Sequence, residues 1–240
     1  MTVLAILQAR MSSSRLPGKV LAPLAGAPMI LRQIERIRRA AQIDRLVVAT
    51  STDGSDDALA NVLAVAGVDL FRGPLDDVLA RFVGALDAFG PTDHVVRLTA
   101  DCPLADPEVI DAVIERVACS DADYGSSTPP RRTFPKGLDA EAMTATALRD
   151  AAARASTPEE REHVTWALHR RADLYRQVFV SQAADEGDVR WTVDYPHDYA
   201  FVSAVYEALY PARPDFTSDD IRRFVRSRPD LSSLGGERRV

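Results

Sequence analysis

The stretch VLAILQARMSSSRLPGK, residues 3–19, joins an apolar run to a basic loop. Its first five residues are all apolar, and a short apolar run that ends in polar residues predicts a strand covered on both faces. The loop holds Arg10, Arg15 and Lys19 and no acidic residue, although the chain has a net charge of −6. Forked arginines and a mobile lysine suit a polyphosphate, and Gly18 lets the backbone approach a ligand closely. We therefore predict an anion site at a strand end, with a solvated basic loop as the alternative.

This loop differs from two common phosphate-binding loops. It contains no GxGxxG sequence, so the dinucleotide fingerprint is absent. The pair Gly18-Lys19 is typical of a Walker A loop, but Ser13 stands where the first glycine is required. Val20 replaces the Ser or Thr that would contact magnesium in such a loop.

Apolar strands alternate with amphipathic helices through the first half of the chain. We predict strands at residues 3–8, 45–50, 68–71 and 94–98, and helices at 28–41, 53–66, 76–88 and 107–118. This alternation predicts an α/β protein, a three-layer Rossmann-like fold with a mainly parallel sheet. Ligands of such sheets bind beyond the carboxyl ends of the strands. Polar or acidic residues follow each predicted strand, so we expect the site at that edge.

The pattern changes after residue 120. Residues 126–137 are rich in Pro, Ser, Thr and Arg and predict a long excursion or a hairpin. We predict further strands at 138–143, 174–180 and 189–193, and helices at 144–155, 158–171, 196–209 and 218–227. We expect one domain over residues 1–240, with a smaller substrate lobe inserted at roughly residues 125–185.

Composition excludes several classes of protein. With 46% hydrophobic and 27% charged residues among 240, the chain has the balance of a globular domain. A pI near 5.3 argues against broad nucleic-acid binding, which needs a surplus of Lys and Arg. No run approaches the ~20 apolar residues of a membrane span, and residues 3–7 are too few for a signal peptide, so we expect a cytoplasmic protein. We expect Cys102 and Cys119 to be reduced thiols and residues 235–240 to fray.

Two aspartates directly follow predicted strands. Asp101 comes after the strand at 94–98 and Asp194 after the strand at 189–193. Strand ends that share one edge of a sheet bring such residues together across long stretches of sequence. Magnesium takes oxygen ligands and is usually held by one or two carboxylates plus substrate phosphates. An aspartate at such a position also suits a turn or a helix N-cap, so the residues alone leave both interpretations open.

Five blocks along the chain carry a family resemblance. They are QARMSSSRLPGKVLAPLAGAPMI (8–30), RLTADCPLADPEVID (97–111), DYGSSTPPRRTFPKGLDAE (123–141), REHVT (161–165) and RWTVDYPHDY (190–199). These blocks resemble the acylneuraminate cytidylyltransferase family, in particular its SpsF-type branch of spore coat polysaccharide biosynthesis. The resemblance covers nearly the whole chain.

The resemblance implies a nucleotide-diphospho-sugar transferase fold and a nucleotidyltransferase reaction. Such an enzyme moves CMP from CTP to an acidic sugar with Mg²⁺, releases pyrophosphate, and serves surface polysaccharide or glycan biosynthesis. The resemblance aligns Asp101 and Asp194 with the magnesium-binding acids of the family, and it implies a homodimer. The chain departs from the family pattern at Ala100, Tyr195 and His197, where Gly, Thr and Glu are usual.

These arguments together yield a set of candidate site residues. We expect catalytic roles for Arg10, Arg15, Lys19 and Asp101. The nucleotide pocket is expected to use the backbone of Leu7, Gln8 and Ala9, together with Arg10, Arg15, Lys19, Ser51, Arg72, Asp76, Arg97 and Thr99. The acceptor sugar is expected to meet Arg132, Lys136, Gly137, Asp139, Glu141 and His163, where cations suit a carboxylate and the two acids, two apart on a strand, suit hydroxyls.

Several alternatives stay open at this point. The basic segment near residue 132 could be a solvated loop or a dimer contact, and His163 could be structural. A glycosyltransferase shares the broad fold and needs an acidic metal motif, which Asp121-Ala122-Asp123 resembles in form, although it follows a helix. A non-catalytic nucleotide- or sugar-binding relative is the second alternative.

Overall fold

The apolar run at the start of the chain forms β1 (Val3–Gln8), an inner strand of a seven-stranded sheet. The computed structural model describes residues 1–240, and the strand order is β5-β4-β1-β6-β8-β7-β9. β4 (Arg45–Ser51), β5 (Asp69–Gly73) and β6 (His94–Thr99) run parallel to β1. β8 (Glu141–Thr144) runs antiparallel to β6 and to β7 (Tyr124–Ser126), while β9 (Gln177–Phe179) is parallel to β7. The predicted mainly parallel sheet is confirmed.

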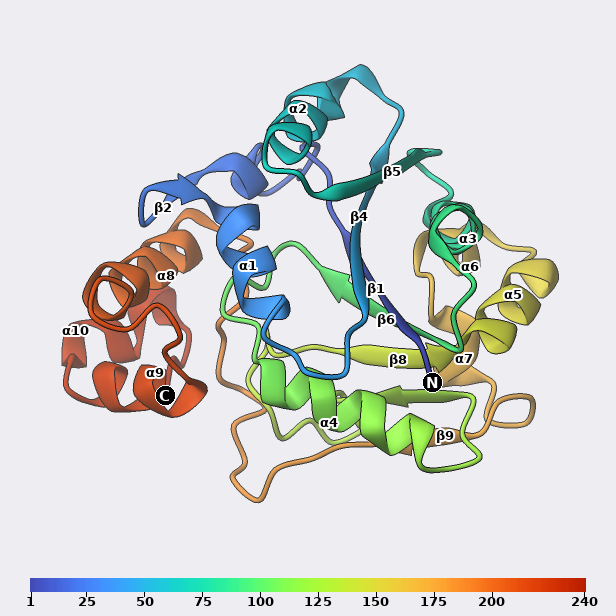
Figure 1. Cartoon of the computed structure of the whole chain (residues 1–240). Helices are drawn as coiled ribbons and strands as arrows, with labels where there is room; N and C mark the ends of the chain where they lie inside the picture. Colours follow the sequence, from blue (N-terminus) through green and yellow to red (C-terminus); the bar gives the residue numbers. More distant parts are fainter.

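Alternate residues of β1 enter two separate hydrophobic cores. Val3, Ala5 and Leu7 pack with helices α1 (Met29–Ile37), α2 (Asp57–Val65) and α4 (Pro107–Ala118). Leu4 and Ile6 pack with α3 (Val78–Phe89), α5 (Ala145–Arg154) and α7 (Trp166–Arg170) on the opposite face. Because side chains alternate along a strand, one apolar run serves both layers. Figure 1 shows α1 and α4 on one side of the sheet and α3 and α5 on the other.

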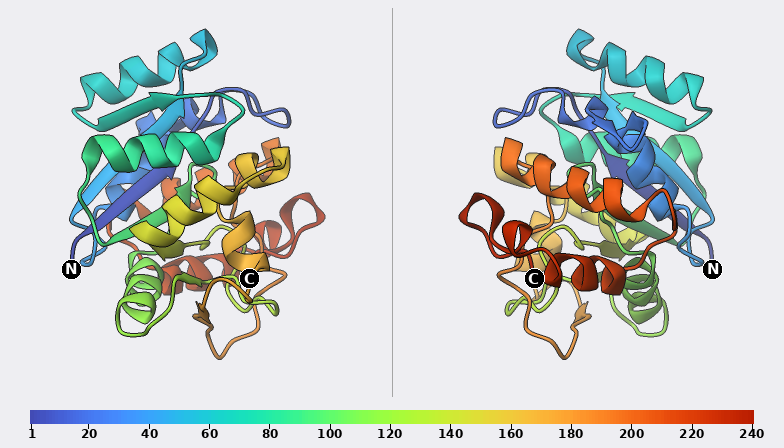
Figure 2. Two further views of the ribbon diagram at one scale, coloured as in Figure 1. Left: turned by 90° about the vertical axis from the view of Figure 1, so that its right-hand side faces the viewer. Right: turned by 90° about the vertical axis from the view of Figure 1, so that its left-hand side faces the viewer.

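A third core joins the end of the chain to this sheet. Helices α8 (Pro196–Leu209), α9 (Ser218–Arg226) and α10 (Pro229–Ser232) pack around the buried Trp191, Phe201 and Phe216. This core also takes in Met29 of α1 and Leu104. The right-hand view of Figure 2 shows α8 and α9 in front of the sheet, on the α1 side. The C-terminal helices therefore brace the region that follows β6.

The short elements complete the description. The first loop ends in the 3-10 turn η1 (Lys19–Leu21), and β2 (Pro23–Leu24) and β3 (Ala27–Pro28) form a small hairpin. Two further 3-10 turns are η2 (Gly54–Asp56) and η3 (Leu234–Gly236). Residues 124–179 contribute β7, β8 and β9 to the same sheet as the first half of the chain. The predicted hairpin over 126–137 is the long connection between β7 and β8, which pair antiparallel.

Three predictions about secondary structure are wrong. The predicted helix over 158–171 is two short helices, α6 (Pro158–Glu162) and α7, separated at residues 163–165. Residues 189–193 form no strand, since their backbone bonds go singly to different segments. Trp191 donates to Lys136, Arg190 to Arg238 and Val193 to Asp101, at 2.7, 2.9 and 2.8 Å.

The third wrong prediction is a frayed tail at residues 235–240. Arg239 is 0% exposed, and its carbonyl accepts a 2.8 Å hydrogen bond from the indole N–H of Trp191. The tail is instead held against the third core, where Val240 is half-buried. None of the helices combines the length and the apolar character that crossing a membrane requires.

Candidate active site

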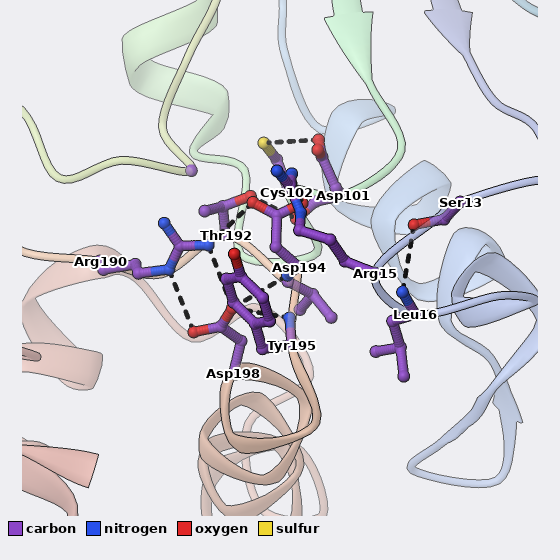
Figure 3. Close-up of polar contacts among 12 residues, drawn as sticks. Ser13, Arg15, Leu16, Asp101, Cys102, Arg190, Thr192, Asp194, Tyr195 and Asp198 are labelled. Carbon is purple, nitrogen blue, oxygen red and sulfur yellow. Dashed lines mark hydrogen bonds and ion pairs between the residues drawn. The ribbon is translucent and has the colours of Figure 1, made fainter. Parts of the chain in front are cut away.

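Asp101 and Asp194 meet although 189–193 is not a strand. The backbone N–H of Val193 donates to the carbonyl of Asp101 at 2.8 Å, and the Thr192 hydroxyl donates to the same oxygen at 3.1 Å. The turn after β6 therefore lies beside the extended segment that leads into α8. Figure 3 shows Arg15 reaching toward Asp194, with Asp101 nearby and its carboxylate against the Cys102 thiol.

Lys19 lies between the two carboxylates. Its ammonium donates to the carbonyl of Val193 at 2.6 Å and to Asp194 Oδ1 at 3.2 Å, and it stands 3.7 Å from Asp101 Oδ2. Gly18 adopts a left-handed conformation (φ 73°) before η1, a backbone that favours glycine and turns Lys19 inward. Arg15 also donates to Asp194 Oδ1, at 2.6 Å. Two of the three predicted loop cations thus converge on Asp194.

The second oxygen of Asp194 is held from the opposite side. Arg190 donates to Asp194 Oδ2 at 2.8 Å and to both oxygens of Asp198 at 3.1 Å. Asp198 also accepts from the backbone N–H groups of Asp194 and Tyr195, each at 3.0 Å, and so caps the start of α8. Burial alone would raise the pKa of both carboxyl groups. Hydrogen bonds and charge from Arg15 and Lys19 outweigh burial and lower the pKa of Asp194. Hydrogen bonds from Arg190, Arg239 and the two backbone amides outweigh burial at Asp198, where the pKa falls to about 2.

A cavity of about 460 Å³ opens beside this cluster. The first loop, the end of β6 and residues 162–163 surround it. Ten of the predicted site residues line it: Gln8, Ala9, Arg10, Arg15, Lys19, Arg97, Thr99, Asp101, His163 and Asp194. Arg10 is exposed and borders an adjoining hollow that contains Asp76.

A second cavity of about 570 Å³ shares Arg97, Thr99 and His163 with the first. The predicted acceptor residues Arg132, Asp139 and Glu141 line this second cavity. The two cavities therefore adjoin at these three shared side chains. Such a pair can hold two reactants next to each other.

Both arginines of the second cavity are paired with acids. Arg97 pairs with Glu141 across the β6–β8 register, and Arg132 pairs with Asp139. Burial alone would raise the pKa of Glu141. The charge of Arg97 and the hydroxyl donors Tyr124 and Thr165 outweigh burial and lower that pKa. Burial raises the pKa of Asp139 despite Arg132. Each arginine is thus held in place by a carboxylate.

Aromatic rings form one wall of the second cavity. Trp166 stacks on His163 with ring centroids 5.6 Å apart and meets His169 edge-on at 6.0 Å. The predicted helix over 158–171 is broken between α6 and α7, and this break places His163 at the junction of the two cavities. A flat aromatic surface next to paired charges suits a ring that carries hydroxyl groups.

The structure places several predicted site residues elsewhere. The Ser51 hydroxyl donates to Asp56 in the interior, and Arg72 donates to the Ser51 carbonyl at 2.8 Å and pairs with Asp57 at 2.7 Å. The Leu7 side chain is in the first core. Neither Ser51, Arg72 nor Leu7 lines either cavity.

Lys136 and Gly137 also lie outside both cavities. Lys136 is exposed on a separate hollow with Asp185 and Asp188. Gly137 has φ +110° and packs against the backbone of Trp191 and Thr192. Lys136 and Gly137 do not line the second cavity with Asp139, because the backbone of Lys136 pairs with that of Val189 and Trp191.

Asp101 and Asp194 are the two aspartates that line the first cavity. The structure contains no group of three or more His, Cys, Asp or Glu side chains placed to hold a metal ion. Asp101 and Asp194 nevertheless share one ammonium group, that of Lys19, so they are close enough to share a cation. Two carboxylates completed by phosphate oxygens fit a hard divalent cation. The rival acidic motif does not reach this place, because Asp121 and Asp123 contact Arg176.

The sequence arguments missed Arg190, Asp198, Tyr124 and Thr165. One signal for Asp198 was present: Pro196 and an acid three residues after Tyr195 are typical of a capped helix start. Arg190 lies only four residues before Asp194 and eight before Asp198, within the block 190–199, but the sequence arguments gave it no role. Tyr124 and Thr165 meet Glu141 from 17 and 24 positions away, a separation that local patterns do not report.

Comparisons with known proteins agree with this geometry. A family model described as "Cytidylyltransferase" matches residues 4–205. The chain belongs to the cytidylyltransferase family. The spore coat polysaccharide biosynthesis protein SpsF of Bacillus subtilis is 33% identical over 238 residues, which cover 96% of this chain and 97% of that protein.

Two further relatives of this cytidylyltransferase extend the comparison. A 3-deoxy-manno-octulosonate cytidylyltransferase of Anaeromyxobacter sp. is 42% identical over 114 residues, covering 47% of this chain and 46% of that one. The solved structure of a cytidylyltransferase from Leptospira borgpetersenii superposes with a TM-score of 0.89 at 26% identity, covering 96% of both chains. The three-layer nucleotidyltransferase fold expected from the sequence is therefore confirmed.

Proposed function

We propose that this cytidylyltransferase transfers CMP from CTP to an acidic sugar and releases pyrophosphate, with Mg²⁺ as cofactor. The observation that carries the proposal is the pair of adjoining cavities, which share Arg97, Thr99 and His163. The first holds the basic loop and the two aspartates, and the second holds paired charges and an aromatic wall. The names of the relatives, which refer to polysaccharide biosynthesis and to an acidic sugar, support this substrate class.

In the proposed reaction, an acceptor oxygen attacks the α-phosphorus of CTP and pyrophosphate leaves. Arg10, Arg15 and Lys19 hold the triphosphate and oppose the charge that builds on the leaving group. Asp101 and Asp194 would hold Mg²⁺, which when bound neutralises phosphate charge and lowers the pKa of the acceptor hydroxyl. His163 and Arg97, at the junction of the cavities, orient the acceptor toward the nucleotide.

The second cavity is the proposed acceptor side, built largely from the segment 125–185. Asp139 and Glu141 keep Arg132 and Arg97 in place, and the same side chains offer hydrogen bonds to sugar hydroxyls. Trp166 provides a flat surface for the sugar ring. The homodimer and the cytoplasmic location expected from the sequence stay predictions.

A purified-protein assay of pyrophosphate release tests the proposal. Each of the four nucleoside triphosphates is combined with a panel of acidic sugars, with and without Mg²⁺. We expect turnover with CTP and Mg²⁺ only, and a rate about 10²–10⁴ lower in Asp101→Asn, since several kcal/mol of charge stabilisation are lost. Asp121→Asn, which changes a side chain 89% exposed, is the matched control and should keep the wild-type rate.

Two results would overturn the proposal. Wild-type turnover in Asp101→Asn would remove the metal assignment. Consumption of a nucleotide-sugar without release of pyrophosphate would indicate a glycosyltransferase instead.

A further inference from the structure

A row of alternating charges runs from the buried tail to the candidate active site. Arg239 donates to Asp198 at 2.8 Å, Asp198 pairs with Arg190, and Arg190 donates to Asp194 Oδ2 at 2.8 Å. Asp194 then meets Lys19 and Arg15 at the cavity. Arg239 and Asp198 are both fully buried, so water does not screen the inner end of this row.

Arg239 is held more tightly than one ion pair requires. Its guanidinium also donates to the carbonyls of Arg190 at 2.8 Å and of Leu234 at 3.0 Å. Its planar fork thus spans Asp198, the backbone of Arg190 and the tail itself, which the single ammonium group of a lysine cannot do. The fork fixes both the backbone and the partner carboxylate of Arg190.

A second contact joins the tail to the same site. Gly235 lies against the ring of His197, and a Cβ at this glycine would overlap that ring. His197 stacks on Tyr195 with centroids 5.4 Å apart, and the Arg15 guanidinium lies 5.5 Å from the Tyr195 ring. Tyr195 and His197, two of the three residues that depart from the family pattern, therefore connect the tail to Arg15.

We infer that Arg239 is a positioning residue for Asp194, acting through Asp198 and Arg190. Arg190 holds Oδ2 of Asp194, which leaves Oδ1 turned toward Lys19, Arg15 and the cavity. Without Arg239, Asp198 loses a buried partner and Arg190 loses the carboxylate geometry that aims it. Asp194 can then rotate, and the oxygen that meets the cation and the triphosphate is no longer fixed. This inference rests on the proposed function, since it gives Asp194 its role there.

The test compares Arg239→Gln and Arg239→Lys with the matched control Arg238→Gln. Arg238 is the neighbouring arginine, but it is exposed and pairs with Asp188 at the surface. Binding of Mn²⁺ in the presence of CTP is measured by electron paramagnetic resonance without any acceptor, and thermal unfolding is recorded in parallel. We expect Mn²⁺ affinity to fall about 10–100-fold in Arg239→Gln, to recover in part in Arg239→Lys, and to stay within twofold in Arg238→Gln.

The milder Arg239→Lys keeps the test decisive if Arg239→Gln does not fold, and a second pair of variants tests the contact between the tail and His197. Gly235→Ala and Gly236→Ala both place alanine at a positive φ, 75° and 79°, but only Gly235 meets His197. Gly235→Ala should weaken CTP binding through Tyr195 and Arg15, whereas Gly236→Ala should not.

The outcomes separate the two ideas. Folded Arg239→Gln that binds Mn²⁺ and CTP as tightly as wild type, with only a lower melting temperature, would show a merely structural residue and overturn the inference. Wild-type protein that binds Mn²⁺ and CTP but turns over no acidic sugar would overturn the proposed function alone.

Discussion

At the scale of single residues, the three cations of the first loop differ in burial and in ion pairing. Lys19 is buried and lies between Asp101 and Asp194, whereas Arg10 is exposed and forms no ion pair. Arg15 pairs with Asp194 from the solvent side, with its side chain 53% exposed. Lys19 is therefore fixed by the protein, while Arg10 and Arg15 are able to turn toward a phosphate.

This division predicts the result of Lys19→Met. The substitution keeps the length of the side chain and removes the ammonium group, which makes hydrogen bonds to charged groups worth roughly 1.5–3 kcal/mol. We expect the dissociation constant for CTP with Mg²⁺ to rise about 10–150-fold in calorimetry. Lys136→Met, at an exposed lysine outside both cavities, should leave it unchanged. Equal affinity in Lys19→Met and wild type would show that Lys19 only holds the aspartates apart.

The sequence allowed the prediction of residues that share a strand end or a loop, and little beyond that. The positions of Asp101 and Asp194 predicted that they lie close together, and the structure places both beside Lys19. Lys19 itself was singled out by its charge in the first loop. Arg190 and Arg239 could not be found, because an arginine reads as a surface residue until its buried partner is known. Ser51 and Arg72 lie outside both cavities, where Ser51 bonds to Asp56 and Arg72 pairs with Asp57.

At the scale of elements, the extended segment before α8 decides the geometry of the site. Apolar residues at 189, 191 and 193 alternate as in a strand, and the prediction of a strand followed from that pattern. In the structure the side chains of these three residues pack into the third core. The backbone of residues 189–193 meanwhile pairs with that of Lys136, Arg238 and Asp101. The alternation of apolar residues predicts correctly which side chains are buried. It does not predict whether the backbone joins a sheet, because its hydrogen-bond partners depend on the tertiary fold.

The close approach of Gly137 to the backbone of Trp191 and Thr192 predicts how a substitution there changes stability and turnover. A Cβ at Gly137 would stand 2.7 Å from the backbone N of Thr192 and 2.8 Å from the carbonyl carbon of Trp191, at a φ of +110°. We expect Gly137→Ala to lower the free energy of unfolding by about 1–3 kcal/mol and to reduce turnover, because the backbone beside Asp101 must move. Urea unfolding and the pyrophosphate assay measure both effects.

Gly67→Ala is the matched control for this prediction. Gly67 also has a positive φ, 63°, but a Cβ there would meet nothing within 4 Å. It should cost stability through the strained φ alone and leave turnover intact. A Gly137→Ala enzyme with wild-type turnover would mean that the segment before α8 adjusts without disturbing the aspartates.

At the scale of the whole molecule, three hydrophobic cores share one sheet and its flanks, and the buried Arg239–Asp198 pair lies against the third of them. Alternate β1 residues divide between two cores, and the C-terminal helices supply the third. The fold class followed from the alternation of strands and helices. The role of the tail did not, because a short segment with two glycines and two arginines before Val240 is typical of a solvated terminus until Trp191 and Asp198 are in place.

The acid stability of the molecule should depend on these buried carboxylates. Hydrogen bonds from Arg190, Arg239 and backbone amides outweigh burial and hold the pKa of Asp198 at about 2 in the folded state. An unfolded chain would return it to about 3.9. A lowered folded pKa contributes stability above the unfolded value, and the contribution is lost as the pH falls through the folded value. Asp198 should therefore contribute about 2 kcal/mol above pH ~4, lost progressively between pH ~4 and pH ~2.

Urea unfolding of wild type and Asp198→Asn across this range measures the contribution. At pH 6 the variant should be less stable, because Arg239 and Arg190 lose a buried counter-charge. The difference between the two proteins should shrink as the pH falls from about 4 to about 2, since the wild-type carboxyl group becomes protonated there. Asp121→Asn, at an exposed aspartate, should follow wild type at every pH. A difference that stays constant with pH would mean that Asp198 stabilises the fold through its hydrogen-bond geometry and not through its charge.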